Sequence, residues 1–112
     1  ASIWSSITKS KRTVYTISKN AILGLTKTMA VETAPFGVTV NAVSPGFTMT
    51  ELTMRTLSEV EILNLSAQVP AKRFADPIEI SNVILFLSSK ENSYMTGQNI
   101  VVDGGFTNVW VI

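Results

Sequence analysis

The sequence of 112 residues contains no cysteine and no histidine. Disulfide bonds, thiolate nucleophiles and zinc sites built from these residues are therefore excluded within the chain. A serine–histidine catalytic triad is excluded for the same reason. Any general acid or base must be a tyrosine, lysine, aspartate or glutamate. One carboxylate makes a poor metal site, so we predict no metal ion and interpret 103–105 (Asp-Gly-Gly) as a turn that ends a strand.

Charge of either sign is also scarce. Nine Lys/Arg and eight Asp/Glu leave a formal net charge of +1, and only Lys9, Lys11 and Arg12 form a block of like charge. A nucleic-acid partner would need a longer basic stripe, so we predict none. No run approaches the ~18 consecutive apolar residues of a membrane span, and no signal peptide precedes the first motifs. We expect no membrane partner and a cytoplasmic location.

What the chain has in quantity is apolar side chains, at 46% of residues, enough for a packed core. Apolar residues recur at four-residue spacing from Thr13, which predicts a helix. Pro35 disfavours helical geometry at Ala34, so the helix should end there. Asp76 and Glu79 form a capping box and predict the start of another helix, which continues to about Ser89. The remaining predicted elements are a buried strand at 38–43, a turn at 44–46, short helices at 51–56 and 58–66, and a strand at 99–102.

Helices that alternate with buried strands predict an α/β fold with a parallel sheet. Two strands cannot form such a sheet alone, because each helix would leave one sheet face uncovered. We therefore expect further strands upstream or in another chain.

Tyr15 and Lys19 are four residues apart in the first predicted helix, so their side chains share one face of it. A nearby ammonium favours the phenolate form of tyrosine. The phenol can then exchange a proton with a carbonyl/alcohol pair. This spacing also arises by chance as a solvated lysine beside a half-buried tyrosine, so it does not decide the function by itself.

The sequence around this pair adds context. Residues 15–19 (Tyr-Thr-Ile-Ser-Lys) resemble the Tyr-x-x-x-Lys signature of the classical short-chain dehydrogenase/reductase family, and residues 20–27 resemble the continuation of that helix. Residues 40–46 resemble the family's strand and Pro-Gly turn. Residues 47–50 come next and include Thr50 at the position where the family has a threonine. Residues 94–98 and 101–105 resemble its closing motifs. The resemblance covers nearly the whole chain, with the motifs in order.

This resemblance implies three catalytic residues. Ser2, thirteen positions before Tyr15, would hydrogen-bond the substrate oxygen. Tyr15 would transfer the proton. Lys19 would hydrogen-bond the nicotinamide ribose and favour the phenolate of Tyr15. The alternative for Ser2 is an ordinary loop hydroxyl in a serine-rich segment.

The resemblance also implies NAD or NADP as cofactor. The Thr48 backbone and the Thr50 hydroxyl would meet the nicotinamide carboxamide, just after the Pro45-Gly46 turn. Tyr15, Lys19, Pro45, Gly46, Thr48 and Thr50 are thus the implied cofactor-binding residues. Alternatively, Pro45 and Gly46 only shape the turn, and Thr50 caps the next helix; a cap uses the oxygen and leaves the hydroxyl hydrogen free.

The family's glycine-rich dinucleotide turn has no counterpart in the chain. We therefore expect residues 1–112 to be the C-terminal portion of one domain with a doubly wound, Rossmann-like fold. The implied function is hydride transfer between NAD(P) and a small carbonyl/alcohol substrate. Two alternatives stay open: dehydratase or epimerase-like chemistry on the same fold, and a non-catalytic truncated member that docks to other subunits.

Two apolar stretches have more than one interpretation. Met49, Leu52, Met54 and Leu57 either line a substrate pocket or pack the short helices onto the body. Residues 106–112, which include Trp110, either contact another subunit or pack within their own. The family commonly forms dimers and tetramers, so we expect a homo-oligomer.

Overall fold

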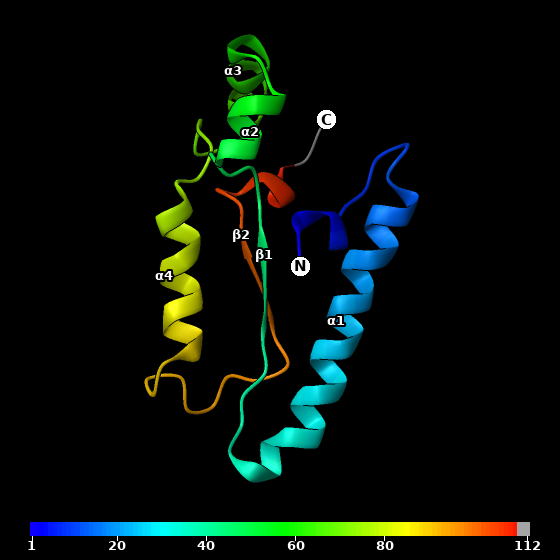
Figure 1. The fold of residues 1–112 in the computed structure, drawn as a ribbon, viewed down its shortest axis with the longest axis vertical. Coiled ribbons are helices and arrows are strands. Elements are labelled where there is room, and N and C mark those ends of the chain that lie inside the picture. The colour runs from blue at the N-terminus through cyan, green and yellow to red at the C-terminus, as the bar shows by residue number, and fades with distance from the viewer. Residues whose placement is uncertain (110–112) are drawn as a thin grey trace.

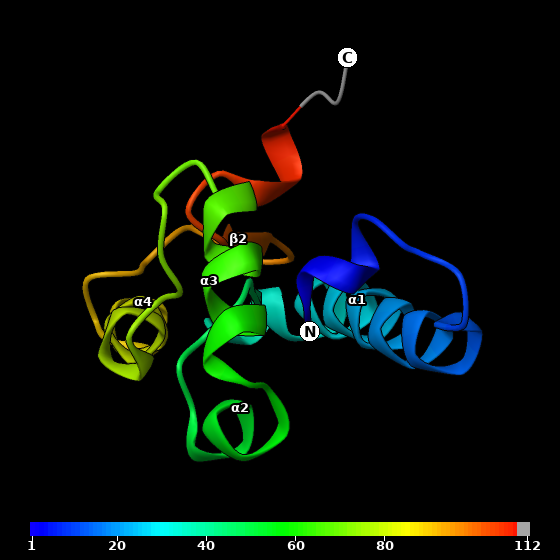
Figure 2. The ribbon, with the colours of Figure 1, turned by 90° about the horizontal axis from the view of Figure 1, so that it is seen from above.

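A two-stranded parallel sheet lies between two helices in the computed structural model, which describes residues 1–109 (Figure 1). Strand β1 (Ala42–Pro45) pairs with β2 (Asn99–Val102), with Ala42 opposite Asn99. Helix α1 (Thr13–Thr33) and helix α4 (Pro77–Ser88) cover opposite faces of the sheet, as the view from above shows (Figure 2). The α/β class and the parallel sheet are confirmed.

Two short helices, α2 (Glu51–Thr56) and α3 (Glu59–Gln68), lie beyond the carboxyl ends of the strands (Figure 1). Single 3₁₀ turns form η1 (Ile3–Ser5), η2 (Ala34–Phe36) and η3 (Phe106–Asn108). The C-terminal stretch 106–112 falls partly on residues 110–112, including Trp110, which lie outside the described residues. No helix among residues 1–109 is long and apolar enough to cross a membrane.

Helix α1 ends where its sequence predicts. Pro35 lies in η2, and Gly37 then turns the chain with a left-handed φ of 74°. The helix packs on the sheet through small and polar side chains, because Thr26 and Ala30 are its buried residues. Its apolar stripe faces away: Val14, Ile17 and Leu25 are 81%, 64% and 59% exposed.

The predicted strand at 38–43 is wrong in its bounds. Extended residues before Ala42 bond to the loop that precedes β2: the Val40 amide donates to Thr96 Oγ1 (2.9 Å). Pro45, predicted to lie in the turn, is instead the last strand residue. Ala42 and Gly46 donate amides toward β2, so by alternation Pro45 faces away from that strand, where a missing N–H disrupts no ladder bond.

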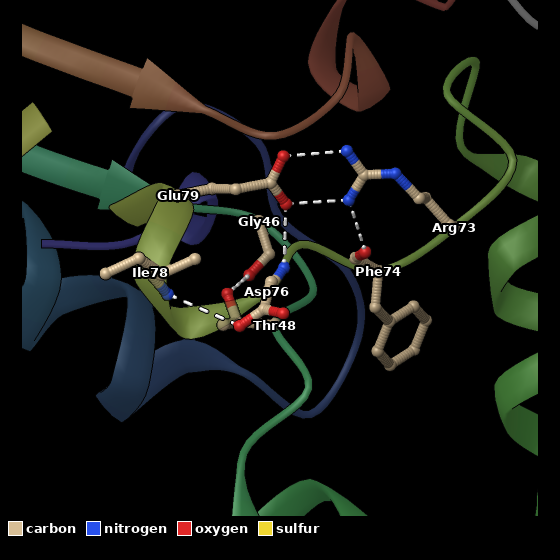
Figure 3. Close-up of polar contacts among 7 residues, drawn as sticks. All are labelled: Gly46, Thr48, Arg73, Phe74, Asp76, Ile78 and Glu79. Atoms are coloured by element: carbon tan, nitrogen blue, oxygen red, sulfur yellow. Dashed lines mark hydrogen bonds and ion pairs between the residues drawn. The ribbon is translucent and has the colours of Figure 1, made fainter. Parts of the chain in front are cut away.

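The predicted start of α4 is confirmed in detail. The Asp76 side chain accepts from the Ile78 amide, and the Glu79 carboxylate accepts from the Asp76 amide (2.8 Å). Arg73 adds two further bonds to Glu79, each 2.7 Å long (Figure 3). This bidentate pair fixes the loop before α4 against the helix start.

Candidate active site

The carboxyl ends of β1 and β2 meet at one edge of the sheet, where open α/β sheets bind ligands. The two loops touch closely: a Cβ at Gly46 would lie 2.7 Å from Asp103 Cα and 2.8 Å from Asp103 Cβ. Only glycine fits there, since the obstacle is backbone. Gly46 thus joins the loop after β1 to the loop after β2.

Asp103 holds the second loop in shape. Its carboxylate accepts from the Gly105 amide (2.9 Å), the Thr107 amide (2.7 Å) and the Thr107 hydroxyl (2.7 Å). Burial raises the pKa of Asp103, but the hydrogen bonds from Thr107 and Gly105 outweigh burial, so the net pKa is lowered. The carboxylate is therefore engaged in the turn that ends β2.

Three phenylalanine rings tie this edge together. Phe47 stacks on Phe74 with ring centroids 5.2 Å apart, and meets the edge of Phe106 at 5.0 Å. The rings come from the loop after β1, the loop before α4 and the loop after β2. Both geometries are favourable for aromatic pairs, so the three segments share one apolar contact at this edge.

Thr48 and Thr50 follow β1 on this rim. The Thr48 hydroxyl donates to the Gly46 carbonyl (3.2 Å; Figure 3). Thr50 caps α2, since its Oγ1 accepts from the Thr53 amide (3.2 Å). The Thr53 hydroxyl donates to the Thr48 carbonyl (2.8 Å). Thr50 is therefore the donor in the 3.0 Å hydrogen bond between the Thr50 and Thr53 hydroxyls. The capping interpretation of Thr50 is confirmed, and its hydrogen must turn from Thr53 to meet a ligand.

Tyr15 and Lys19 lie together in the first two turns of α1. The Lys19 ammonium is 5.1 Å from the centroid of the Tyr15 ring, and Tyr15 is 39% exposed. Lys19 Nζ donates no hydrogen bond within residues 1–109, which leaves its donors open to a ligand. This end of α1 faces the same end of the molecule as the carboxyl ends of the strands (Figure 1).

Ser2 lies between the sheet and α1 but touches neither Tyr15 nor Lys19 by a hydrogen bond among the described residues. It is 7% exposed, and its Oγ accepts from the Trp4 amide (3.3 Å), which caps η1. The Ser5 hydroxyl contacts Ser44 Oγ of β1 at 3.5 Å, and the Thr8 and Thr16 hydroxyls meet at 3.0 Å. These contacts hold the Ser2 segment between β1 and α1.

Sequence reasoning missed the surroundings of Tyr15. The Arg12 guanidinium lies 5.7 Å from the centroid of the Tyr15 ring and 5.8 Å from that of Trp4, while Lys9 lies 5.4 Å from Trp4. The sequence does show a basic block at 9–12 between Trp4 and Tyr15. It does not show that Trp4 and Tyr15 both lie near Arg12, because that depends on how the segment folds.

The Met- and Leu-rich stretch is only partly packed. Leu52 and Met54 are 70% and 58% exposed, so they do not pack α2 onto the body within the described residues. Met49 and Leu57 are half-buried. The pocket-wall interpretation of these side chains stays a prediction.

Comparison with known proteins decides the family. A family model described as enoyl-(acyl carrier protein) reductase matches residues 1–107. The chain is 40% identical over 102 residues to the oxidoreductase UcpA of Salmonella typhimurium, covering 85% of this chain and 39% of that protein. It is 45% identical over 91 residues to the 3-oxoacyl-[acyl-carrier-protein] reductase FabG of Vibrio cholerae, covering 81% of this chain and 37% of FabG.

A solved structure agrees. The crystal structure of a short chain dehydrogenase family protein from Francisella tularensis matches with a TM-score of 0.88 and 32% identity, over 97% of this chain and 49% of that one. The chain belongs to the short-chain dehydrogenase/reductase family. The family's fold is confirmed for this chain, and the chain spans less than half the length of each of these relatives.

Proposed function

We propose that residues 1–112 are the C-terminal, catalytic portion of a short-chain dehydrogenase/reductase domain. The complete enzyme, in which an N-terminal dinucleotide-binding portion precedes them, moves hydride between NAD(P) and a small carbonyl/alcohol substrate. The observation that supports this most is the Lys19 ammonium 5.1 Å from the centroid of the Tyr15 ring. The start of α1 lies toward the same end of the molecule as the carboxyl ends of the strands (Figure 1). The oxidoreductase relatives support the reaction type.

In this proposal Tyr15 gives a proton to the carbonyl oxygen during reduction and takes it back during oxidation. Lys19 keeps its ammonium beside the Tyr15 ring, 5.1 Å from the ring centroid. The Ser2 hydroxyl keeps its hydrogen available, since its oxygen only accepts from Trp4, and donates it to the same substrate oxygen. The two donors stabilise negative charge as it develops on that oxygen.

The residues on the rim fit a nicotinamide cofactor. Lys19 has free donors for ribose hydroxyls, the Thr48 amide has no partner within residues 1–109, and Thr50 can reorient its hydroxyl toward a carboxamide. Pro45 and Gly46 set the path of the chain to these threonines. When bound, the nicotinamide supplies or accepts the hydride.

Absorbance of NAD(P)H at 340 nm tests the proposal in the complete enzyme, with a panel of aldehydes, ketones, alcohols and a 3-oxoacyl thioester. We expect Tyr15→Phe to lower kcat by about 10²–10⁴-fold, the usual contribution of general acid–base catalysis. The matched control is Tyr94→Phe, which removes the same hydroxyl from a loop residue that is 97% exposed. Full activity of Tyr15→Phe would overturn the proposed role.

We also propose that the complete enzyme is a cytoplasmic homo-oligomer, a dimer or tetramer. The large apolar side chains on the outer face of α1 support an assembled state, with Val14 81% and Val31 77% exposed. Light scattering after size-exclusion chromatography tests the assembly, and a monomer at micromolar concentration would contradict it.

A further inference from the structure

Positive charge is concentrated at the start of the chain. Five of the nine Lys/Arg and none of the eight Asp/Glu lie in residues 1–31. The catalytic pair proposed above, Tyr15 and Lys19, lies within this segment. Two of these cations, Arg12 and Lys19, lie against the Tyr15 ring, whereas the chain as a whole is nearly neutral.

These cations converge on two aromatic rings. The Arg12 guanidinium is within 6 Å of both ring centroids, at 5.8 Å from Trp4 and 5.7 Å from Tyr15. Lys9 contacts the same Trp4 ring at 5.4 Å. A guanidinium held against aromatic faces keeps its N–H donors at its rim, pointing past the rings. Arg12 therefore places a positive charge beside the Tyr15 ring.

No carboxylate among residues 1–109 forms an ion pair with Lys9 or Arg12. The ion pairs among the described residues are Arg55–Glu51 and Arg73–Glu79, both away from it. The side chains of Lys9 and Arg12 donate no hydrogen bond within residues 1–109. Cations held together without a counter-charge repel one another. A negatively charged group is the complement that this arrangement lacks.

We propose that the substrate carries an anionic group, a carboxylate or a phosphate, which Arg12 and Lys9 bind beside Tyr15. This inference rests on the hydride-transfer function proposed above and adds the substrate class. The planar fork of Arg12 can hold two oxygens of the anion at once. Because Arg12 also contacts the Tyr15 ring, an anion on its rim places the neighbouring carbonyl carbon of a short substrate near the phenol.

Two matched pairs test the inference in the complete enzyme: acetoacetate against methyl acetoacetate, and dihydroxyacetone phosphate against dihydroxyacetone. The measured quantity is the ratio of kcat/KM for the anionic member to kcat/KM for the neutral one. We expect Arg12→Gln to lower this ratio about tenfold, typical of a lost charge-assisted hydrogen bond. Arg12→Lys keeps the charge but loses the fork, and lowers it less. The pair with the larger effect identifies carboxylate or phosphate.

Lys27→Gln is the matched control. It removes one charge from α1 about 20 Å farther along the helix, beyond the screening length of about 10 Å at 0.1 M salt, and leaves the ratio unchanged. Added NaCl should lower the wild-type ratio and affect the Arg12→Gln ratio less. Equal ratios in wild type and Arg12→Gln would overturn the anion site alone. Absence of turnover for every member of both pairs and of the wider panel would instead overturn the proposed hydride transfer.

Discussion

The carboxyl edge of the sheet is closely packed, whereas the outer face of α1 is largely exposed. At the edge, backbone meets backbone at Gly46 and Asp103, and the Asp103 carboxylate accepts three hydrogen bonds. On the outer face of α1, Ile17 and Leu25 stand 64% and 59% exposed, while the residues turned to the sheet are Thr26 and Ala30.

The difference separates contacts that residues 1–109 complete among themselves from an apolar surface that they leave uncovered. The edge needs no further side chain to be packed and hydrogen-bonded. The helix has its larger apolar residues on the side that this chain does not cover, and exposed apolar patches of that kind mark interaction surfaces. The loops at the carboxyl edge are therefore packed and hydrogen-bonded within residues 1–109, whereas the outer face of α1 is uncovered there.

The largest expected effect comes from expressing residues 1–112 alone. We expect aggregation or misfolding, because apolar helix surface and sheet edges stay exposed. Ile17→Gln with Leu25→Gln should raise the soluble fraction, whereas Ala30→Gln, which places a polar group at a buried site, should not. Sedimentation and light scattering measure this. A soluble, monomeric, cooperatively melting wild-type product would show that the exposed apolar face of α1 does not prevent residues 1–112 from folding alone.

A second prediction concerns Phe47, which joins the rings of Phe74 and Phe106 at the edge. Phe47→Ala removes both aromatic contacts and should lower the free energy of unfolding of the complete enzyme by about 3 kcal/mol. Phe36→Ala is the matched control, because its ring is 81% exposed, and should stay within about 0.5 kcal/mol. Chemical denaturation measures the free energy of unfolding of both variants. Equal decreases would show that the Phe47 ring contacts add no stability.

Much of the fold was predictable because its signals are local. Pro35 and Gly37 end α1, and Asp76 with Glu79 starts α4 through hydrogen bonds between residues close in sequence. The family signature placed Tyr15 and Lys19 one helical turn apart, as the structure has them. These features need no knowledge of distant segments.

The errors came from features that depend on distant partners. The β-branched run 38–43 looks like a strand, but Val38 bonds back to Thr33, and Val40 bonds to the Thr96 hydroxyl and the Gly97 amide of the loop before β2. Pairing therefore begins only at Ala42. Periodicity located the apolar stripe of α1 without saying which side meets the sheet. The Trp4–Arg12–Tyr15 stack likewise requires η1 to fold back against α1, which local sequence does not specify.

A third prediction tests the close approach of the two edge loops. Gly46→Ala forces Asp103 backbone to move, and should destabilise the complete enzyme by about 1–3 kcal/mol, as overpacked sites do. Gly24→Ala is the control on α1, where a new Cβ meets nothing within 4 Å. Alanine there adds up to about 1 kcal/mol of helix stability where this part of α1 stays open, and costs stability where a subunit contact covers it. Thermal unfolding compares the two, and a loss at Gly24 as large as at Gly46 would show that α1 is closely covered.

The smallest expected effect is the pH dependence from Glu79 at the start of α4. Hydrogen bonds from Arg73 and from the Asp76 amide lower the pKa of Glu79 to about 2, against an ordinary value of 4.5. Because the folded-state pKa is the lower one, the stabilisation is fully present above pH 4.5 and is lost as the pH falls toward 2. Glu79→Gln should therefore flatten the fall in melting temperature of the complete enzyme between pH 4.5 and 2. Glu91→Gln changes a carboxylate with no ion pair among the described residues and should leave that slope as in wild type. An unchanged slope in Glu79→Gln would show that the Arg73 pair does not stabilise the start of α4.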